Sequence, residues 1–166
     1  MRHLDCGKVQ IYTGDGKGKT TAALGLAFRA LGYGLDVHML QFAKKLRCSE
    51  HEAAERFGLK ITQATMPTPK ECADEILSLA HDALGSRGSD PVDVLILDEV
   101  GEAMRRGFVT REDIERLIEA KPDTTELVLT GRGLLPLADL ADLVTEMRPI
   151  KHYFDEGLLA RKGIEY

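Results

Sequence analysis

A segment near the N-terminus combines glycines, a lysine and a hydroxyl group in the order that a phosphate-binding site needs. Its residues are Thr13, Gly14, Asp15, Gly16, Lys17, Gly18, Lys19, Thr20 and Thr21. Glycines let the backbone curl so that several N–H groups point at one anion, and the N-terminus of a following helix favours negative charge. In such a loop Lys19 contacts the outer phosphates of a nucleotide, and the Thr20 hydroxyl is a ligand for Mg²⁺. We therefore predict that this segment binds a nucleotide.

The segment departs at one position from the usual pattern of a phosphate-binding loop, G-x-x-x-x-G-K-[ST]. Thr13 stands where the first glycine is expected, and Gly14 follows it. The alternative is a plain surface turn rich in glycine and lysine. A strand-like run at 9–12 and a helix-like run at 22–30 flank the segment, and this order favours the phosphate site. Lys17 has two interpretations, since it either contacts phosphate or points outward from the loop.

Two adjacent carboxylates at the end of an apolar run form the second candidate. The run at 94–97 precedes Asp98 and Glu99. In phosphate-loop enzymes such a strand delivers a carboxylate to the metal beside the phosphates. Asp98 would hold Mg²⁺ directly or through water, and Glu99 would be a second ligand or, in an ATP hydrolase, the base that activates water. The alternative is a core strand whose acidic end caps the next helix.

The third candidate, Thr130-Gly131-Arg132, also follows directly after a strand-like run. The carboxyl ends of parallel strands converge on one crevice. We therefore expect Arg132 to reach a phosphate and Gly131 to allow close approach of the backbone. The alternative is a strand-to-helix turn with a solvated arginine.

Strand-like and helix-like segments alternate along the chain, which is typical of a parallel sheet covered on both faces. The expected strands lie at 9–12, 36–42, 59–63, 92–97, 127–130 and 143–147. The expected helices lie at 22–30, 50–57, 70–84, 102–106 and 111–120, with a short helical turn at 137–141. We expect Thr110 to cap one of them, and the tail at 152–166 to be a closing loop. The prediction is an α/β fold, a three-layer P-loop NTPase-like domain with a mainly parallel sheet that spans residues 1–166.

Composition limits the class of protein. The chain has 166 residues, a net charge of −5 and no basic stripe, so nucleic acid is not an expected partner. No apolar run approaches the ~20 residues that a membrane-spanning helix needs, so no membrane association is expected. Cys6, Cys48 and Cys72 are odd in number and far apart, which indicates neither a disulfide framework nor a zinc site. These features together predict a cytoplasmic protein.

A phosphate-binding loop does not determine which bond of ATP breaks. Attack on the γ-phosphorus by water gives an ATPase, and attack by a hydroxyl group gives a kinase. Attack on C5′ of the ribose releases the whole triphosphate. In that third case a strong nucleophile needs positioning, and cations on the leaving group, rather than a general base. The residues considered so far leave all three reactions open.

Several segments together carry a resemblance to a known family, the ATP:corrinoid (cob(I)alamin) adenosyltransferases of the CobA/CobO/BtuR type. The resemblance includes the threonine-for-glycine form of the loop, which is the family's own. The matching segments lie at 10–23, 37–42, 97–99, 129–132 and 141–152. The match continues through Phe154, Gly157, Ala160 and the final run at 163–166. It therefore extends over nearly the whole chain.

The resemblance implies transfer of the 5′-deoxyadenosyl group of ATP to the Co(I) of a reduced corrinoid, which gives adenosylcobalamin or an adenosylcobinamide-type product and tripolyphosphate. It implies that Thr20 and Glu99, with Asp98 beside them, bind Mg²⁺ or Mn²⁺, and that the loop holds the triphosphate. We expect Lys19, Glu99 and Arg132 to be the catalytic residues. The family is typically homodimeric, and a reductase must supply electrons for Co(I). The alternatives are a P-loop ATPase or kinase, and a non-catalytic carrier of ATP or corrinoid.

Two features depart from the family's pattern. Family members commonly carry a longer N-terminal segment that helps to cover the nucleotide, whereas six residues precede Gly7 here. They also carry an aromatic pair near the lower face of the corrinoid. This chain has no tryptophan, and the corresponding region at 61–72 offers Met66. Expulsion of a lower ligand is then expected to depend on other apolar residues or to matter less.

Overall fold

The computed structural model describes residues 3–42 and 47–166. Within these residues a six-stranded sheet has the order β3-β2-β4-β5-β1-β6, and all neighbouring strands are parallel. The strands are β1 (Val9–Thr13), β2 (Val37–Gln41), β3 (Lys60–Gln63), β4 (Val94–Asp98), β5 (Glu126–Thr130) and β6 (Leu143–Glu146). The helices are α1 (Lys19–Tyr33), α2 (Ser49–Phe57), α3 (Pro69–Ala83), α4 (Val100–Arg105) and α5 (Arg111–Ala120), with 3₁₀ helices η1 (Leu135–Leu140) and η2 (Tyr153–Glu156). The predicted α/β fold with a parallel central sheet is confirmed.

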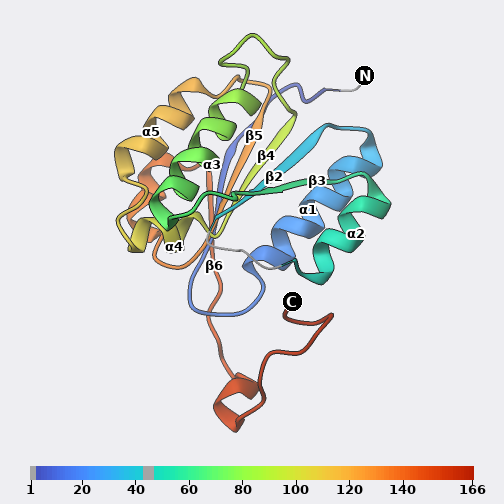
Figure 1. Cartoon of the computed structure of the whole chain (residues 1–166), viewed down its shortest axis with the longest axis vertical. Coiled ribbons are helices and arrows are strands. Elements are labelled where there is room, and N and C mark those ends of the chain that lie inside the picture. Colours follow the sequence, from blue (N-terminus) through green and yellow to red (C-terminus); the bar gives the residue numbers. More distant parts are fainter. Residues whose placement is uncertain (1–2, 43–46) are drawn as a thin grey trace.

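Helices cover both faces of the sheet, as Figure 1 shows, with α1 and α2 on one face and α3, α4 and α5 on the other. Each face carries its own cluster of buried side chains. In β4, Val94 and Ile96 belong to the cluster under α1, whereas Leu95 and Leu97 belong to the cluster under α3 and α5. A parallel strand buried on both faces is apolar at successive positions, and the first polar residue of this strand is Asp98 at its end.

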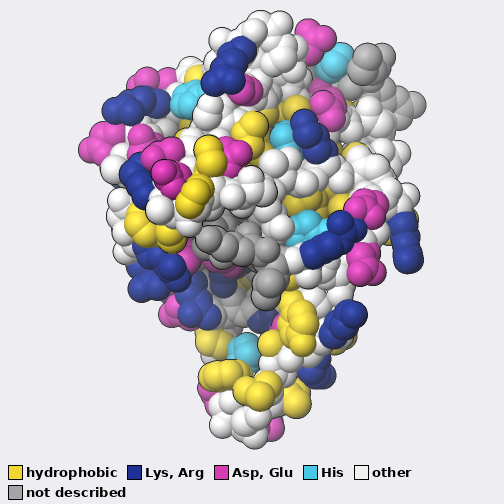
Figure 2. All heavy atoms as spheres, in the orientation of Figure 1, with side chains coloured by type: hydrophobic (Ala, Val, Ile, Leu, Met, Phe, Trp, Pro, Cys, Tyr) yellow, Lys and Arg dark blue, Asp and Glu magenta, His cyan; other side chains and the backbone are white. Residues whose placement is uncertain are grey.

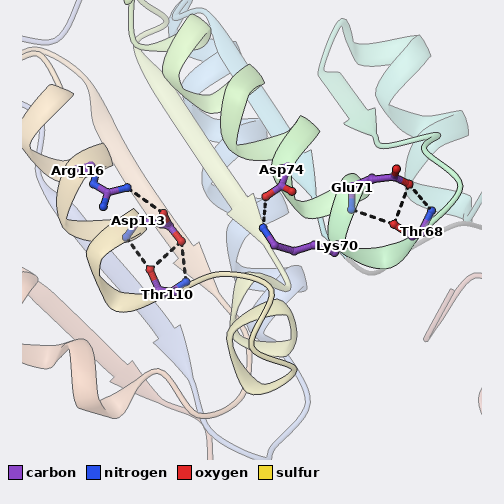
Figure 3. Close-up of polar contacts among 7 residues, drawn as sticks. All are labelled: Thr68, Lys70, Glu71, Asp74, Thr110, Asp113 and Arg116. Carbon is purple, nitrogen blue, oxygen red and sulfur yellow. Dashed lines mark hydrogen bonds and ion pairs between the residues drawn. The ribbon is translucent and has the colours of Figure 1, made fainter.

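Two helices on one face begin at capping boxes, which Figure 3 shows in detail. Thr110 Oγ1 accepts a hydrogen bond from the N–H of Asp113, and the Asp113 carboxylate accepts one from the N–H of Thr110 at 2.9 Å. Thr68 and Glu71 form the same pair before α3, which begins at Pro69. Each box satisfies N–H groups that the helix leaves unpaired, and such a cap is worth about 1 kcal/mol. The Thr110 cap predicted from the sequence is present.

The carboxyl ends of the strands lie at the lower edge of the sheet in Figure 1. After β6 the chain leaves this edge, passes through η2 and ends beside α1 and α2. The tail, predicted as a loop, therefore contains one short 3₁₀ helix. Of the helices in the described part of the chain, none is long and apolar enough to cross a membrane.

His38 of β2 is a buried histidine that the fold keeps neutral. The residue is 5% exposed, and its Nε2 lies 2.9 Å from Oγ1 of Thr62 on β3. Burial, and then the charge of Lys60, lower the pKa of His38 from 6.5 to about 4. Between pH 6.5 and pH 4 the unfolded chain therefore binds a proton that the native protein does not, and stability is lost as the pH falls through this window.

We expect the free energy of unfolding of the wild-type protein to fall by up to about 2 kcal/mol more than that of His38→Gln between pH 7 and pH 5. Glutamine keeps a hydrogen-bonding group near Thr62 and does not titrate. Urea denaturation at the two pH values measures the difference. Equal losses in the two proteins would contradict a depressed pKa at His38.

Candidate functional site

The predicted phosphate-binding segment connects β1 to α1 at the carboxyl edge of the sheet (Figure 1). Thr13 is the last residue of β1 and is fully buried, and its Oγ1 accepts a hydrogen bond from the N–H of Leu134 at 3.1 Å. Gly14 and Gly18 have φ angles of +98° and +121°, which residues with a side chain rarely adopt. The threonine therefore ties the loop to the chain after β5, and glycines make the turn.

The residue after β6, Met147, packs its backbone against the loop. Its N–H donates to the carbonyl of Thr13 at 2.8 Å, and its carbonyl accepts from the N–H of Gly16 at 2.7 Å. A Cβ atom on Gly14 or Gly16 would lie 2.4 or 2.7 Å from the Met147 carbonyl oxygen, closer than real Cβ contacts. This packing requires glycine at both positions. Because the Gly16 N–H is bound to Met147, a phosphate must be held by other amides of the loop.

Lys19 is the first residue of α1, and its side chain folds over the loop. The residue is 8% exposed, and its Nζ donates to the carbonyls of Gly14 and Gly16 at 2.8 and 2.7 Å. Burial lowers the pKa of Lys19, and the charge of nearby Glu99 opposes this effect. The ammonium group therefore lies in a poorly solvated position at the centre of the loop, where its charge acts strongly on a bound anion.

Lys17 and Asp15 are exposed residues of the same loop. Lys17 Nζ donates to the carbonyl of Ile164 at 3.0 Å and lies 3.3 Å from the carboxylate of Glu165. Lys17 therefore pairs with the C-terminal tail, but it also lines the cleft described below, so both interpretations of this residue stay predictions. Asp15 Oδ1 lies 4.0 Å from Nε of Arg132, which brings the turn after β5 to the loop.

Asp98, the last residue of β4, is fully buried and joins the loop to the sheet. Its Oδ1 accepts hydrogen bonds from the hydroxyls of Thr20 and Thr130, both at 2.8 Å. Its Oδ2 accepts from Nε2 of Gln41 at 3.1 Å. Two of the three residues predicted as metal ligands, Thr20 and Asp98, are thus in direct contact, and Glu99 follows next in the chain. Hydroxyl and carboxylate oxygens are the ligands that Mg²⁺ prefers.

Glu99 lines the cleft described below, and its backbone is strained. Among residues 3–42 and 47–166 it is the one non-glycine residue with a positive φ, at 59°. Its N–H donates to Oγ1 of Thr130 at 3.0 Å, which holds this turn against β5. The left-handed conformation costs a residue with a side chain roughly 1–2 kcal/mol, and such strain concentrates at functional sites.

We expect Glu99→Gly to be more stable than Glu99→Ala by about 1 kcal/mol, because glycine adopts a positive φ without a Cβ penalty. Both variants lack the carboxylate that is predicted from the sequence to bind Mg²⁺, so on that prediction both should lose the effect of Mg²⁺ on nucleotide binding to the same extent. Chemical denaturation and nucleotide titration measure the two quantities separately. Equal stability of the two variants would argue against backbone strain at this residue.

The turn after β5 packs directly on the start of α4. Gly131 has a φ of +140°, and a Cβ atom there would lie 2.5 Å from the backbone nitrogen of Gly101. A Cβ atom on Gly101 would in turn lie 2.3 Å from the carbonyl oxygen of Arg132. Glycine is required on both sides of this contact. The contact joins the turn that carries Arg132 to the chain shortly after Asp98 and Glu99.

A cleft of about 870 Å³ lies beside the loop, between α1, α2 and the tail. One part of its lining is polar and includes Lys17, Lys19, Thr20, Thr21, Glu99 and Arg132. Another part is apolar and includes Leu24, Phe28, Leu31, Ala53, Phe57 and Leu59. The rings of Phe28 and Phe57 meet edge to face, with centroids 5.3 Å apart. The volume is within the range of ligand-binding clefts, and the lining suits a ligand with an anionic group at the loop and an apolar part beyond it.

A family model for the ATP:corrinoid adenosyltransferases BtuR/CobO/CobP matches residues 5–166. The chain belongs to this family. Corrinoid adenosyltransferase CobA of Salmonella typhimurium is 37% identical over 168 residues, which cover 96% of this chain and 86% of the relative. Corrinoid adenosyltransferases of Pseudomonas aeruginosa and Escherichia coli K12 are each 33% identical, over 96% of this chain and 84% and 86% of their own lengths. The resemblance inferred from the sequence is confirmed.

Three contacts of this member of the corrinoid adenosyltransferase family fall outside the predicted site residues. Gln41 binds Asp98, Met147 binds the loop, and Glu165 of the tail pairs with Lys17. Gln41 has a sequence signal, because its polar side chain ends a mostly apolar strand. Met147 has none, because its contact is made by the backbone. The pairing of the tail joins residues far apart in the chain, which no local pattern reveals.

Proposed function

We propose that the protein transfers the 5′-deoxyadenosyl group of ATP to the cobalt of a reduced corrinoid and releases tripolyphosphate. The observation that carries the proposal is the family match over residues 5–166. The relatives that are 33–37% identical are named corrinoid adenosyltransferases. The loop and the carboxylates suit any reaction of a nucleotide with a divalent cation, so family membership decides which bond of ATP breaks.

In the proposed reaction the electron pair of Co(I) attacks C5′ of ATP. A Co–C bond forms, the C5′–O bond breaks, and the electron pair of that bond leaves with the triphosphate. The nucleophile carries no proton, so no general base is needed. The chain has to position ATP and stabilise the charge that develops on the leaving group. We propose that Lys19, the loop amides and Arg132 supply this stabilisation, which is supported by the burial of Lys19 and by the presence of both side chains in one cleft.

We propose that Thr20, Asp98 and Glu99 hold Mg²⁺ or Mn²⁺ between the loop and β4. The all-oxygen donor set supports this ion, which when bound would neutralise charge on the triphosphate oxygens. The hydroxyl proton of Thr20 is directed at Asp98 Oδ1, 2.8 Å away. The lone pairs of the Thr20 oxygen therefore remain available to a cation. Asp98 thus orients the threonine in addition to any direct contact that it makes.

The corrinoid is proposed to contact the region at 61–72, which runs from β3 through the connecting loop into the start of α3. Met66 is 43% exposed there. A smaller cavity of about 250 Å³ beside this region has Ala64, Pro69 and Cys72 in its lining. Gln41 lines the same cavity, which therefore borders the carboxyl edge of the sheet where ATP is proposed to bind. Apolar residues of this region would take the place of the family's aromatic pair.

A homodimer, a reductase and a cytoplasmic location complete the proposal. Figure 2 shows hydrophobic side chains gathered on the tail at the lower end of the molecule. Ile150, Phe154 and Leu159 there are 97%, 63% and 71% exposed, which supports contact with a second copy. The reductase follows from the chemistry, because Co(I) must be generated before it attacks. The free thiols of the cysteines suit a reducing compartment.

The test is to incubate the protein with ATP, Mg²⁺ and chemically reduced cobalamin and to follow the corrinoid spectrum. The expected result is a light-sensitive Co–C product together with an equal amount of tripolyphosphate. Formation of ADP without a corrinoid product would instead support an ATPase or kinase. Binding of ATP and corrinoid without turnover would support a carrier.

A further inference from the structure

Side chains at the ends of three neighbouring strands form a hydrogen-bonded row. In the register of the sheet, Gln63 of β3 lies opposite Gln41 of β2, and Gln41 lies opposite Asp98 of β4. Gln63 Nε2 donates to Gln41 Oε1 at 3.1 Å, and Gln41 Nε2 donates to Asp98 Oδ2 at 3.1 Å. The row then reaches the loop, because the Thr20 hydroxyl donates to Asp98 Oδ1. Hydrogen bonds therefore run from the edge strand of the sheet to the proposed metal ligand.

The position of Gln41 requires a group that accepts on one side and donates on the other. The residue is 1% exposed, so its amide cannot satisfy its hydrogen bonds with bulk water. A carboxylate only accepts hydrogen bonds, so Nε2 must face Asp98 and Oε1 must face Gln63. Glutamate here would set one carboxylate against another. An apolar side chain would leave Asp98 Oδ2 without this donor.

We propose that Gln41 is a positioning residue of the metal site. Donors on both oxygens of Asp98 restrict rotation of its carboxylate, and this keeps Oδ1 on the Thr20 hydroxyl. Gln63 acts on the site through Gln41, because it fixes the orientation of the Gln41 amide. Residues that orient a ligand in this way typically change metal affinity or activity 10- to 100-fold when they are replaced. The inference rests on the proposed function, in which Thr20, Asp98 and Glu99 hold Mg²⁺.

Gln41→Met removes both hydrogen bonds and nearly preserves the length of the side chain. Calorimetry measures the dissociation constant of ATP with excess Mg²⁺ and with EDTA. We expect the gain in affinity that Mg²⁺ provides to fall about 10-fold or more, while binding in EDTA changes little. Met39→Leu is the matched control, because Met39 is fully buried two residues earlier in the same strand. A merely structural role would weaken binding in both conditions or only lower the melting temperature, and that result would overturn the proposal.

Gln63→Met gives a second measurement. It tests the effect of the hydrogen-bonded row on the metal site even if Gln41→Met does not fold. Gln63 is only partly buried, so its replacement should be tolerated. We expect a smaller loss of the Mg²⁺ effect in the same direction. The double variant Gln41→Met/Gln63→Met should lose no more than Gln41→Met alone, because Gln63 acts through Gln41. An unchanged Mg²⁺ effect in Gln63→Met, or additive losses in the double variant, would contradict the claim that Gln63 acts on the metal site through Gln41.

These measurements separate the positioning role from the proposed reaction. A wild-type protein that binds ATP more tightly with Mg²⁺ but forms no Co–C product would contradict the proposed reaction, and the variants would still test the row. A wild-type protein that binds ATP equally well with and without Mg²⁺ would overturn the positioning role directly. Loss of the Mg²⁺ effect in the glutamine variants alone, with Met39→Leu unchanged, supports it.

Discussion

Replacing Lys19 by alanine is expected to lower kcat/KM for adenosyl transfer by roughly 10²- to 10³-fold, which corresponds to about 3–4 kcal/mol of transition-state stabilisation. The ammonium group is buried at the centre of the loop, and Nζ binds the carbonyls of Gly14 and Gly16. When triphosphate leaves, negative charge increases on its oxygens. A desolvated cation next to that charge stabilises the leaving group more strongly than an exposed one does.

Steady-state assays of Co–C bond formation at saturating corrinoid measure this loss. Lys70→Ala is the control, because Lys70 is an exposed lysine of α3 whose partner is Asp74 on the same helix (Figure 3). Its removal should leave kcat/KM within about twofold of the wild type, since a surface ion pair contributes little. A kcat/KM of Lys19→Ala equal to that of the wild type would contradict a role of Lys19 in stabilising the leaving group.

Asp98→Ala is expected to destabilise the protein by about 3 kcal/mol and to abolish the effect of Mg²⁺ on ATP binding. The substitution leaves the Thr20 and Thr130 hydroxyls and the Gln41 amide without their common acceptor. Each buried donor without a partner costs about 1–3 kcal/mol, and hydroxyl groups recover part of this cost by rotating. The Thr20 hydroxyl also loses the contact that orients it, so the site should lose metal affinity together with stability.

Asp93→Ala provides a control that separates the two effects. Asp93 is also buried, at 5% exposure, but it precedes β4 at the opposite edge of the sheet. Its carboxylate accepts a hydrogen bond from the N–H of Asp36 at 2.8 Å and lies 3.0 Å from Nδ1 of His3. Urea denaturation should show a loss of stability in both variants, whereas calorimetry should show a loss of the Mg²⁺ effect only in Asp98→Ala. Equal Mg²⁺ effects in the two variants would exclude a special role of Asp98.

The parts of the fold and of the candidate site that could be predicted from the sequence are those that a local pattern encodes. The loop, the apolar strand ending in Asp98, and the Thr110 cap each lie within a few consecutive residues. The strand order is different, because the strands are only four or five residues long and nothing within one strand specifies its neighbours in the sheet. The contact between Gln41 and Asp98 joins residues 57 positions apart and exists only because β2 neighbours β4. No pattern within either strand predicts that pairing.

Thr13 is a position where the sequence reveals an unusual residue but not the reason for it. In the sequence it stands where a phosphate-binding loop usually has glycine. In the structure its hydroxyl oxygen accepts a hydrogen bond from the N–H of Leu134, 121 positions away. Gly14 then provides the turn, with a positive φ and close packing against Met147. The physical reason for the threonine therefore lies in the tertiary structure. The family resemblance identified the threonine as typical of the family but gave no reason for it.

The place of β1 between β5 and β6 has a consequence for synthesis of the chain. β1 carries the loop, yet its two neighbours in the sheet are β5 and β6, which span Glu126–Thr130 and Leu143–Glu146. A nascent chain that has emerged only as far as β4 has no partner for its first strand, and the backbone of Met147 is not yet present to bind Gly16. Nucleotide binding should therefore begin only after β5, β6 and Met147 have left the ribosome, although the loop precedes all of them in the chain.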